Sequence, residues 1–145
     1  GVNRRFQKKG VYHGTEVIDD YAHHPTEIKA TLAAAKKVAK GTLWCVFQPH
    51  TYTRAKLLLE DFGKAFADAD RIIVTDIYAA REKDTGLIHS REIAQKIKDN
   101  GKDAQYLSSF DEIVTYLKST LSPDDMLITM GAGGVYLVGE KLLEA

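Results

Sequence analysis

The feature that most constrains the fold is a regular alternation of two kinds of segment along the chain. Short runs rich in β-branched and aromatic residues alternate with longer segments in which apolar residues recur at helical spacing. The run TLWCVFQP at 42–49 is too apolar and too short to be anything but a buried strand. Alternating strands and helices, with continuously apolar strands, predict an α/β fold: an open, mostly parallel sheet with helices on both faces.

Turn and capping residues divide this alternation into individual elements. A first strand near 5–12 is expected to pair with the next through a turn at 13–14, which gives an N-terminal β-hairpin. Ser90 is expected to open a helix, and Ser109 and Glu112 have capping-box spacing at the start of another. The other strands are expected at 14–22, 42–49, 71–78, 104–107 and the start of 125–145, and the helices at 25–40, 54–69, 90–101, 109–121 and the end of 125–145.

The composition narrows the classes of partner. Because 20 lysines and arginines balance 20 aspartates and glutamates, no global field draws the chain to nucleic acid or to an anionic membrane. The single cysteine, Cys45, lies in an apolar run and is predicted to be a buried structural thiol. Without a bilayer-spanning stretch or a signal-peptide pattern, a soluble, cytoplasmic protein is expected. A chain of 145 residues suits one domain.

The unusual polar residues gather in the loops that follow the predicted strands. These loops are DYAHH at 20–24, QPHTYTR at 48–54, the segment 78–90 and the glycines at 131–134. The loops at the opposite edge, AKGT, ADADR, DNGKDA and LSPDD, are predicted to be ordinary solvated turns. Because ligands of open parallel sheets bind at the carboxyl ends of the strands, this asymmetry predicts a functional site at that edge.

Asp20 and the neighbouring histidines also allow structural explanations. Asp20 could be an acidic residue at a helix N-terminus, which the helix dipole favours. His23, His24 and His50 could bind a metal together with Asp20, but no cysteine or glutamate completes a recognisable ligand spacing, so no metal site is predicted.

The glycine turn and the second loop point to an anion more than to a dinucleotide. Gly131–Gly134 follows the last strand without the G-x-G-x-x-G spacing, which favours a tight turn that faces an anion. Arg54, in a first helical turn, opposes the helix dipole and therefore calls for an anionic partner. The chain has no phosphate loop and no nucleophile elbow, so the edge is interpreted as half of an active site.

Four motifs together resemble a known family. NRRFQ at 3–7, DDYAHHPTE at 19–27, FQPHTYTR at 47–54 and GAGG at 131–134, in this order and spacing, resemble the C-terminal domain of the bacterial Mur ligases. The resemblance covers essentially the whole chain and is strongest to the member that adds L-alanine. It implies a Rossmann-like domain, the third of an enzyme whose N-terminal domain holds a UDP-sugar and whose central domain carries the phosphate loop.

The resemblance also implies a reaction in peptidoglycan precursor synthesis. ATP would phosphorylate the lactyl carboxylate of UDP-N-acetylmuramate, and the amine of L-alanine would attack the acyl phosphate to form an amide. Mg²⁺ would bridge the phosphates and be held mainly by the central domain. The C-terminal domain would close over the central one to complete the nucleotide site, and would be inactive alone.

Residue by residue, the likeness assigns roles to the carboxyl-edge loops. Arg5 matches the family arginine that reaches the ATP phosphates, a role suited to a permanently charged fork of donors. Asp20 matches the aspartate that contacts the nucleotide, where a carboxylate can accept from both ribose hydroxyls. Tyr21, His23 and Arg54 match positions that face the UDP-sugar and the amino acid.

Two more histidines belong to the same motifs. His24 and His50 are grouped with the substrate-binding residues by the resemblance, without a single role for either. Many family members have arginine where this chain has Thr51, so a cation near the substrate carboxylate is missing or comes from elsewhere. The loop at 79–84 is predicted to be solvated, although Arg81 or Lys83 could face a phosphate.

Three other functions stay open on the sequence. One is the related ligase that recycles murein tripeptide, which differs in its acceptor pocket. Another is a nucleotide- or anion-binding module without catalysis, which predicts micromolar affinity in the isolated chain. The last is a small metal-dependent hydrolase that uses Asp20 and the histidines, which predicts stoichiometric zinc or manganese.

Overall fold

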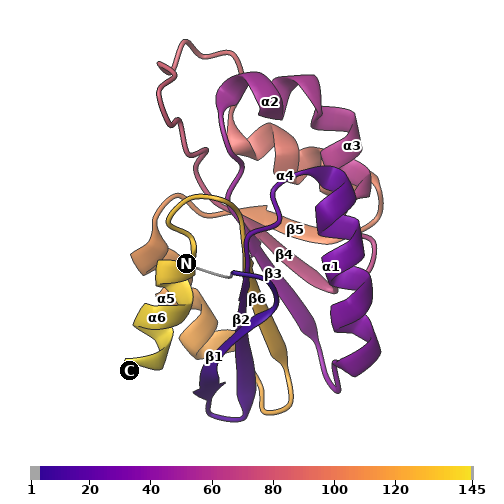
Figure 1. Cartoon of the computed structure of the whole chain (residues 1–145), viewed down its shortest axis with the longest axis vertical. Helices are drawn as coiled ribbons and strands as arrows, with labels where there is room; N and C mark the ends of the chain where they lie inside the picture. Colours follow the sequence, from indigo (N-terminus) through magenta and orange to yellow (C-terminus); the bar gives the residue numbers. More distant parts are fainter. Residues whose placement is uncertain (1–3, 145) are drawn as a thin grey trace.

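A six-stranded sheet forms the centre of the structure, a computed structural model that describes residues 4–144 (Figure 1). The strand order is β1-β2-β6-β3-β4-β5, and only the β1–β2 pair is antiparallel. The predicted α/β class, the mostly parallel sheet and the N-terminal hairpin are confirmed. The elements are β1 (Gln7–Tyr12), β2 (Thr15–Asp20), α1 (Pro25–Val38), β3 (Leu43–Phe47), α2 (Tyr52–Leu57), α3 (Leu59–Lys64), β4 (Arg71–Val74), α4 (Ser90–Asp99), β5 (Asp103–Tyr106), α5 (Phe110–Thr120), β6 (Met126–Met130) and α6 (Tyr136–Leu143).

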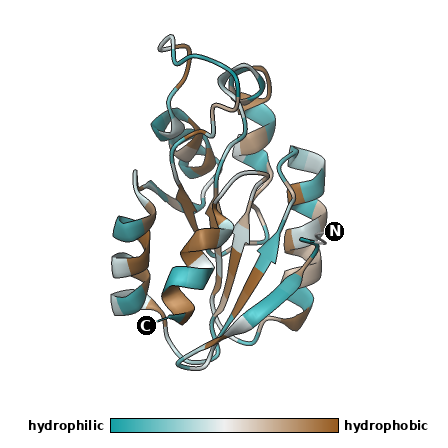
Figure 2. Ribbon diagram, turned by 60° about the vertical axis from the view of Figure 1, so that its left-hand side comes forward, coloured by the Kyte–Doolittle hydropathy of each residue, from teal (hydrophilic) through white to brown (hydrophobic). Residues whose placement is uncertain are grey.

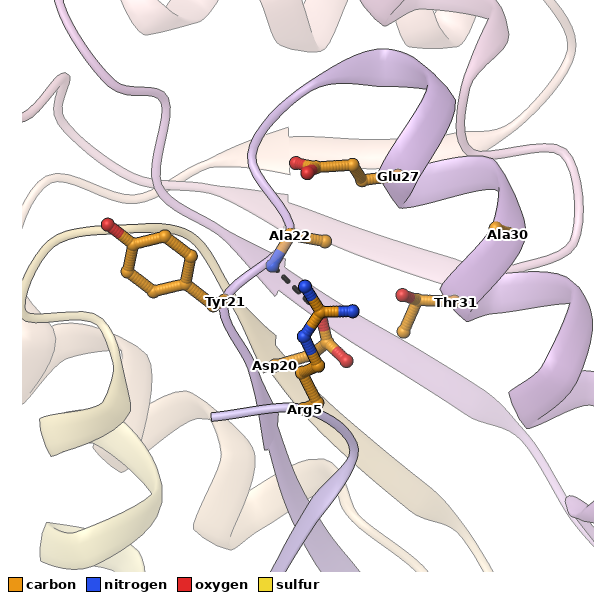
Figure 3. Close-up of a pocket in the computed structure, with 7 residues that line it drawn as sticks. All are labelled: Arg5, Asp20, Tyr21, Ala22, Glu27, Ala30 and Thr31. Atoms are coloured by element: carbon orange, nitrogen blue, oxygen red, sulfur yellow. Dashed lines mark hydrogen bonds between the residues drawn. The ribbon is translucent and has the colours of Figure 1, made fainter. Parts of the chain in front are cut away.

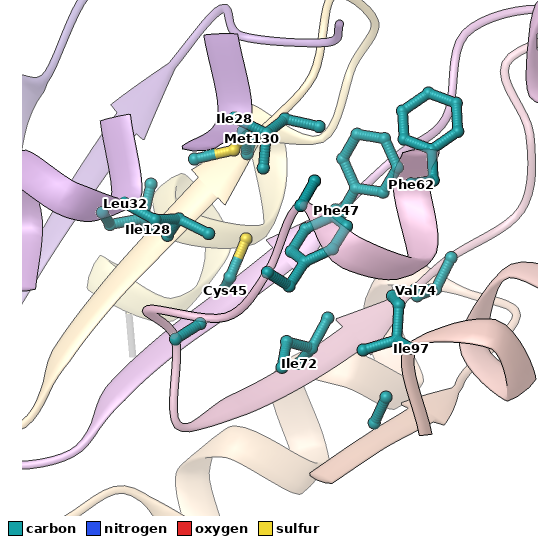
Figure 4. Close-up of a cluster of buried hydrophobic side chains, with 14 of the residues drawn as sticks. Ile28, Leu32, Cys45, Phe47, Phe62, Ile72, Val74, Ile97, Ile128 and Met130 are labelled. Atoms are coloured by element: carbon teal, nitrogen blue, oxygen red, sulfur yellow. The ribbon is translucent and has the colours of Figure 1, made fainter. Parts of the chain in front are cut away.

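The helices cover both faces of the sheet and bury a separate apolar cluster on each. Helices α1, α3 and α4 pack on one face, where Cys45 and Phe47 of β3 point, and Figure 4 shows this cluster. Helices α5 and α6 pack on the other face, against Trp44 and Val46 of the same strand. Successive residues of β3 therefore serve opposite faces, which is why the strand is apolar throughout. In Figure 2 the inner strands are mostly brown and the helices carry teal on their outer turns.

The buried thiol fits its predicted structural role. Cys45 is fully buried in the larger cluster, and this burial raises the pKa of its thiol well above the ordinary range. A thiol that stays protonated behaves as a small apolar group.

Two details of the predicted helices are wrong: the extent of the helix at 54–69, and the capping role of Ser90, although α4 does begin at Ser90 as predicted. The helix expected over 54–69 is two short helices that meet at Leu58, followed by tight turns in which Ala65 and Ala69 each bond three residues back. The helix expected to open at Ser90 is capped by His89, whose ring accepts from the Arg91 N–H. Ser90 is instead buried, and its hydroxyl donates to the Thr75 carbonyl at 2.6 Å. The capping residue is therefore one position earlier than the sequence predicted.

The strand expected over 71–78 is shorter because the chain leaves the sheet after Val74. It then forms an isolated parallel bridge in which the Thr51 N–H donates to the Tyr78 carbonyl and the Tyr78 N–H donates to the Pro49 carbonyl, both at 2.8 Å. This bridge brings the loop after β4 against the loop after β3. The two loops are therefore held together beyond the end of the sheet.

At the opposite edge, one of the turns predicted to be solvated contains a buried acid. Asp125 is 7% exposed and accepts hydrogen bonds from three donors: the Thr42 N–H, the Trp44 indole N–H and the Ser122 N–H. The prediction of an ordinary solvated turn is wrong for this residue, because its carboxylate joins the turns before β3 and β6.

Among residues 4–144, no helix has the length and apolar character needed to cross a membrane.

Candidate functional site

Four strands end at the same level of the sheet, where the sequence predicts the site. Asp20 of β2 and Phe47 of β3 are both in register with Met130 of β6, and Phe47 is in register with Val74 of β4. The loops that follow start side by side, since the Gly131 N–H donates to the Asp20 carbonyl at 3.2 Å. The predicted gathering of carboxyl-edge loops is confirmed.

Asp20 is a buried carboxylate whose two oxygens both accept backbone hydrogen bonds. Oδ2 accepts from the Phe6 N–H and Oδ1 accepts from the Ala22 N–H, each at 2.8 Å. Phe6 has a positive φ of 43°, so the carboxylate holds a bend that a phenylalanine rarely adopts. Asp20 is not an N-terminal acid of α1, because that helix is capped by His24. Each oxygen keeps a lone-pair direction for a further donor.

A pocket of about 260 Å³ opens beside this carboxylate. Figure 3 shows the guanidinium of Arg5 next to Asp20, with Thr31 on the α1 side of the pocket. Arg5 is exposed, so its five donors remain available to an incoming acceptor. A permanent cation beside a partly free carboxylate can bind a ligand that offers both an anionic group and hydroxyls. The pocket is lined by Arg5, Asp20, Tyr21, Ala22, Glu27, Ala30 and Thr31.

The arginine that precedes Arg5 points inward. Arg4 forms a two-point ion pair with Asp19, with Nε 2.7 Å from Oδ2 and Nη2 3.2 Å from Oδ1. Both side chains are largely buried, and Arg4 also donates to the Gly133 carbonyl in the glycine turn at 3.1 Å. Sequence reasoning missed this pair. The available signal was a match between two doublets: Arg4 precedes Asp19 by the same number of residues as Arg5 precedes Asp20.

A row of aromatic rings runs across the site. The ring of His23 lies 5.2 Å from that of Tyr21 and 5.7 Å from that of His50, and the ring of His50 lies 5.6 Å from that of Tyr78. The structure therefore brings together Tyr21, His23 and His50, as predicted. His24 is separate: its Nδ1 accepts from the Thr26 N–H at 3.3 Å as the N-cap of α1.

The second loop is held by an acid from the third. The Glu82 carboxylate accepts from the Tyr52 N–H at 2.6 Å and from the Thr53 N–H at 3.1 Å, at the start of α2. The chain thus supplies its own anion at the helix start where Arg54 was expected to need a ligand. Arg54 is exposed, and so are Arg81 and Lys83 in the loop predicted to be solvated.

The glycine turn is explained by close packing. A Cβ on Gly131 would lie 2.7 Å from the Gln48 carbonyl oxygen, and one on Gly133 would lie 2.6 Å from Gln48 Oε1. Only glycine allows the turn to approach Gln48 this closely. The turn is tight, as predicted, whereas an anion facing it stays a prediction.

Two buried polar atoms at this edge lack a hydrogen-bond partner within the described part of the chain. They are Oε1 of Gln48 and Nδ1 of His50. Buried polar atoms are nearly always paired, so unpaired ones at a sheet edge mark a place where a ligand or a water can bind.

The pKa of His50 lies below the ordinary value of 6.5. Burial is the main cause, and the charges of His23 and Arg54 act in the same direction while Glu82 opposes them. Because the folded state binds this proton less readily than the unfolded chain, the stability from neutral His50 is complete above pH 6.5 and is lost as the pH falls toward the folded-state pKa. We expect the His50 ring signals to titrate below pH 6.5 in NMR spectra. In His50→Gln the unfolding free energy should depend less steeply on pH in this window; an unchanged slope would contradict the shift.

A second pocket of about 300 Å³ lies where β4 and β5 end. The Tyr106 hydroxyl donates to the Asp76 carboxylate there. Burial, reinforced by the Asp76 hydrogen bond and charge, raises the pKa of Tyr106 to about 12.

We expect Asp76→Asn to lower this Tyr106 pKa toward the ordinary tyrosine value, with part of the increase remaining because burial persists. Stability linked to the protonated phenol is present below the unfolded pKa of about 10 and is lost as the pH rises through the folded value. A pH titration followed by the NMR shift of the Tyr106 ring measures this, and an unchanged pKa in the variant would contradict the role of Asp76.

Among residues 4–144, no group of three or more His, Cys, Asp or Glu side chains is arranged to hold a metal ion.

Comparison with known proteins identifies the family. A family model described as Mur ligase, glutamate ligase domain matches residues 4–133. The UDP-N-acetylmuramate–L-alanine ligase of Acetivibrio thermocellus is 60% identical over 144 residues, which is 99% of this chain and 31% of the relative. That of Clostridium novyi is 54% identical over 145 residues, 100% of this chain and 32% of the relative.

Solved structures agree with these relatives. The UDP-N-acetylmuramate-alanine ligase of Thermotoga maritima matches with a TM-score of 0.79 and 29% identity, over 99% of this chain and 30% of that one. A murein peptide ligase of Psychrobacter arcticus matches with a TM-score of 0.81 and 27% identity, over 99% of this chain and 30% of that one. The chain thus spans about 31% of the length of the relatives it matches. Because the family match runs from Arg4 through the carboxyl-edge loops to Gly133, the chain belongs to the Mur ligase family.

Proposed function

We propose that this chain is the C-terminal domain of an ATP-dependent ligase that joins L-alanine to the lactyl carboxylate of UDP-N-acetylmuramate through an acyl phosphate. The observation that carries the proposal is the pocket where exposed Arg5 lies beside buried Asp20 at the carboxyl ends of the strands. The relatives with 60% and 54% identity are ligases of this name. Residues 1–145 would form one domain of a three-domain cytoplasmic enzyme of peptidoglycan precursor synthesis.

In this proposal Arg5 and Asp20 bind the nucleotide. The guanidinium of Arg5 would contact the phosphates and stabilise the negative charge that develops as the γ-phosphoryl group is transferred. Asp20 would accept from the ribose hydroxyls through the lone pairs that its two backbone bonds leave free. Because these backbone bonds fix the carboxylate before any ligand arrives, no reorganisation is needed on binding.

The aromatic row and the second loop would face the other substrates. Tyr21, His23, His50 and Arg54 would orient the UDP-sugar and L-alanine, with Arg54 as the cation for a carboxylate or phosphate. The proposal for His24 changes: its cap on α1 gives it a structural role that orients the loop before the helix.

Mg²⁺ would be held mainly by the rest of the enzyme. The residues described here include no metal-binding group, so this chain would contribute the Arg5 guanidinium to the ATP phosphates and leave the metal ligands to the other domains. By itself the domain would be inactive, because the phosphate loop and most of the UDP-sugar site would lie in the other two domains. ATP, UDP-N-acetylmuramate and L-alanine are thus proposed partners of the complete protein.

The murein-tripeptide recycling ligase is a second candidate. The likeness to a murein peptide ligase at a TM-score of 0.81 favours it, whereas the two relatives at 60% and 54% identity favour the alanine-adding enzyme. Within a complete enzyme, the two are distinguished by whether L-alanine or a tripeptide serves as the acceptor.

The test is a titration of this chain with Mg-ATP and then UDP-N-acetylmuramate, followed by amide shifts in NMR spectra. We expect weak binding, with a Kd of about 1 mM, and shifts confined to residues near 5, 20–24, 50–54 and 131–134. Arg5→Ala should weaken ATP binding about tenfold, because it removes a charge-assisted contact to phosphate. Arg5 is exposed, so the substitution should leave the packing of the fold unchanged.

Arg81→Ala is the matched control, since Arg81 is also an exposed arginine in a loop at the carboxyl ends of the strands. We expect it to leave ATP affinity unchanged. A loss in Arg81→Ala in place of Arg5→Ala would move the phosphate subsite to the loop at 79–84. A Kd near about 1 μM would favour a self-sufficient binding module, and shifts at the opposite edge would reject the ligase assignment.

A further inference from the structure

The Arg4–Asp19 ion pair is the most buried ion pair in the described part of the chain. The Arg4 side chain is 12% exposed and that of Asp19 is 2% exposed. Asp19 is held from the other side, because the Thr129 hydroxyl donates to its Oδ1 at 2.7 Å. The Arg4 guanidinium also lies over the ring of Tyr136, 4.9 Å from its centroid. These contacts leave the arginine one orientation.

The pair lies directly beside the residue proposed to contact phosphate. On one side of Arg5, the Tyr21 N–H donates to the Arg4 carbonyl at 2.5 Å; on the other, the Phe6 N–H donates to Asp20 at 2.8 Å. Arg5 itself is exposed in the pocket, so the contacts of its neighbours Arg4 and Phe6 set the place of its backbone. The side chain of Arg4 ties this segment to buried Asp19 and to the glycine turn through Gly133, while the Phe6 side chain packs against the apolar cluster of α1, α3 and α4.

We propose that the Arg4–Asp19 pair is a positioning device for Arg5: it locks the segment before β1 so that the Arg5 guanidinium stands over the phosphate side of the pocket. The inference rests on the proposed function for what Arg5 does, but not for the lock itself. A buried ion pair is a poor source of net stability and can instead select one arrangement. The two-point geometry requires the planar fork of arginine, which lysine cannot reproduce.

The first test measures the lock without any ligand. Hydrogen exchange of the Phe6 and Tyr21 amides is compared in the unsubstituted chain, Arg4→Gln and Arg71→Gln. Arg71 is the matched control, because it pairs with Asp103 at 3.3 Å on the opposite edge of the sheet. The two variants are compared under conditions that give them the same unfolding free energy. We expect the protection of both amides to fall at least about tenfold in Arg4→Gln and to be unchanged in Arg71→Gln. Unchanged protection in Arg4→Gln would overturn the proposal.

The second test asks whether Arg4 acts through Arg5. Mg-ATP affinity is measured for Arg4→Gln, Arg5→Ala and the double variant. We expect Arg4→Gln to bind Mg-ATP about tenfold more weakly than the unsubstituted chain, and the double variant to bind no more weakly than Arg5→Ala. Arg4→Lys should restore only part of the affinity that Arg4→Gln loses. Additive losses would mean that Arg4 acts independently of Arg5, which would overturn the positioning role.

The double variant R4Q/D19N removes both charges and leaves no unpaired buried carboxylate, so it provides the same comparisons if Arg4→Gln fails to fold. If the unsubstituted chain binds no nucleotide, the proposed function fails, and the hydrogen-exchange result alone decides whether the lock exists.

Discussion

Replacing Gly131 by alanine is expected to destabilise the chain by about 3 to 5 kcal/mol. Gly131 is buried with φ +147°, a conformation essentially restricted to glycine, which costs a side-chain residue about 1 to 3 kcal/mol. The new Cβ would also lie 2.7 Å from the Gln48 carbonyl oxygen, and overpacking of this kind adds about 1 to 3 kcal/mol. Because the neighbour is backbone, it cannot rotate away. Urea unfolding measures the loss. An unchanged dependence of the unfolding free energy on urea concentration would show that the variant still unfolds in two states.

Gly134→Ala is the matched control within the same turn. A Cβ there meets its nearest neighbours, Leu137 and Phe110, at 3.8 Å, which is ordinary contact. We expect a change within about 0.5 kcal/mol. Equal losses in Gly131→Ala and Gly134→Ala would show that flexibility of the whole turn matters, and would contradict the packing argument.

Replacing Asp125 by alanine is expected to cost about 3 kcal/mol. The substitution leaves the Thr42 N–H, the Trp44 indole N–H and the Ser122 N–H without their acceptor, and each unpaired buried donor costs about 1 to 3 kcal/mol before water relieves part of it. Asp125→Asn, which keeps one acceptor oxygen, should lose less. Thermal and urea unfolding of both variants measure the difference.

An exposed aspartate provides the comparison. Asp61, in the first turn of α3, is exposed, and Asp61→Ala should change the unfolding free energy by about 0.5 kcal/mol or less. If Asp125→Ala lost no more than Asp61→Ala, the carboxylate would be a solvated surface group, as its sequence context suggests.

The fold was largely predictable because its pattern is local and repeated. Continuous apolar runs of five residues, such as β3, can be buried only with helices on both faces, and the helical segments between them meet that need. Prediction failed where a boundary depends on the exact bonding partner. Nothing in the period of 54–69 distinguishes an α-helix from the tight turns that follow Lys64, since both bury Phe66 and Ala69.

The sequence predicted the location of the site better than the role of each residue in it. Because parallel strands end at one edge, the loops carrying Asp20, His23 and His50 were expected together and lie together. Individual roles were not predictable, since His24 could serve a ligand or a helix cap and the choice depends on the orientation of its ring. Glu82 was hidden for a related reason: its partners, Tyr52 and Thr53, are 30 and 29 residues away.

The sequence by itself determined the α/β class, the order of its elements and the edge of the sheet that carries the polar loops, because these depend on hydrophobic period and chain order. Only the tertiary structure decided which arginine of the doublet Arg4-Arg5 enters the interior and which faces the pocket. Adjacent residues at the end of a strand point to opposite sides, so Asp19 and Asp20 serve different surroundings and their partners separate with them. That separation depends on packing around Thr129 and Gly133, more than a hundred residues away.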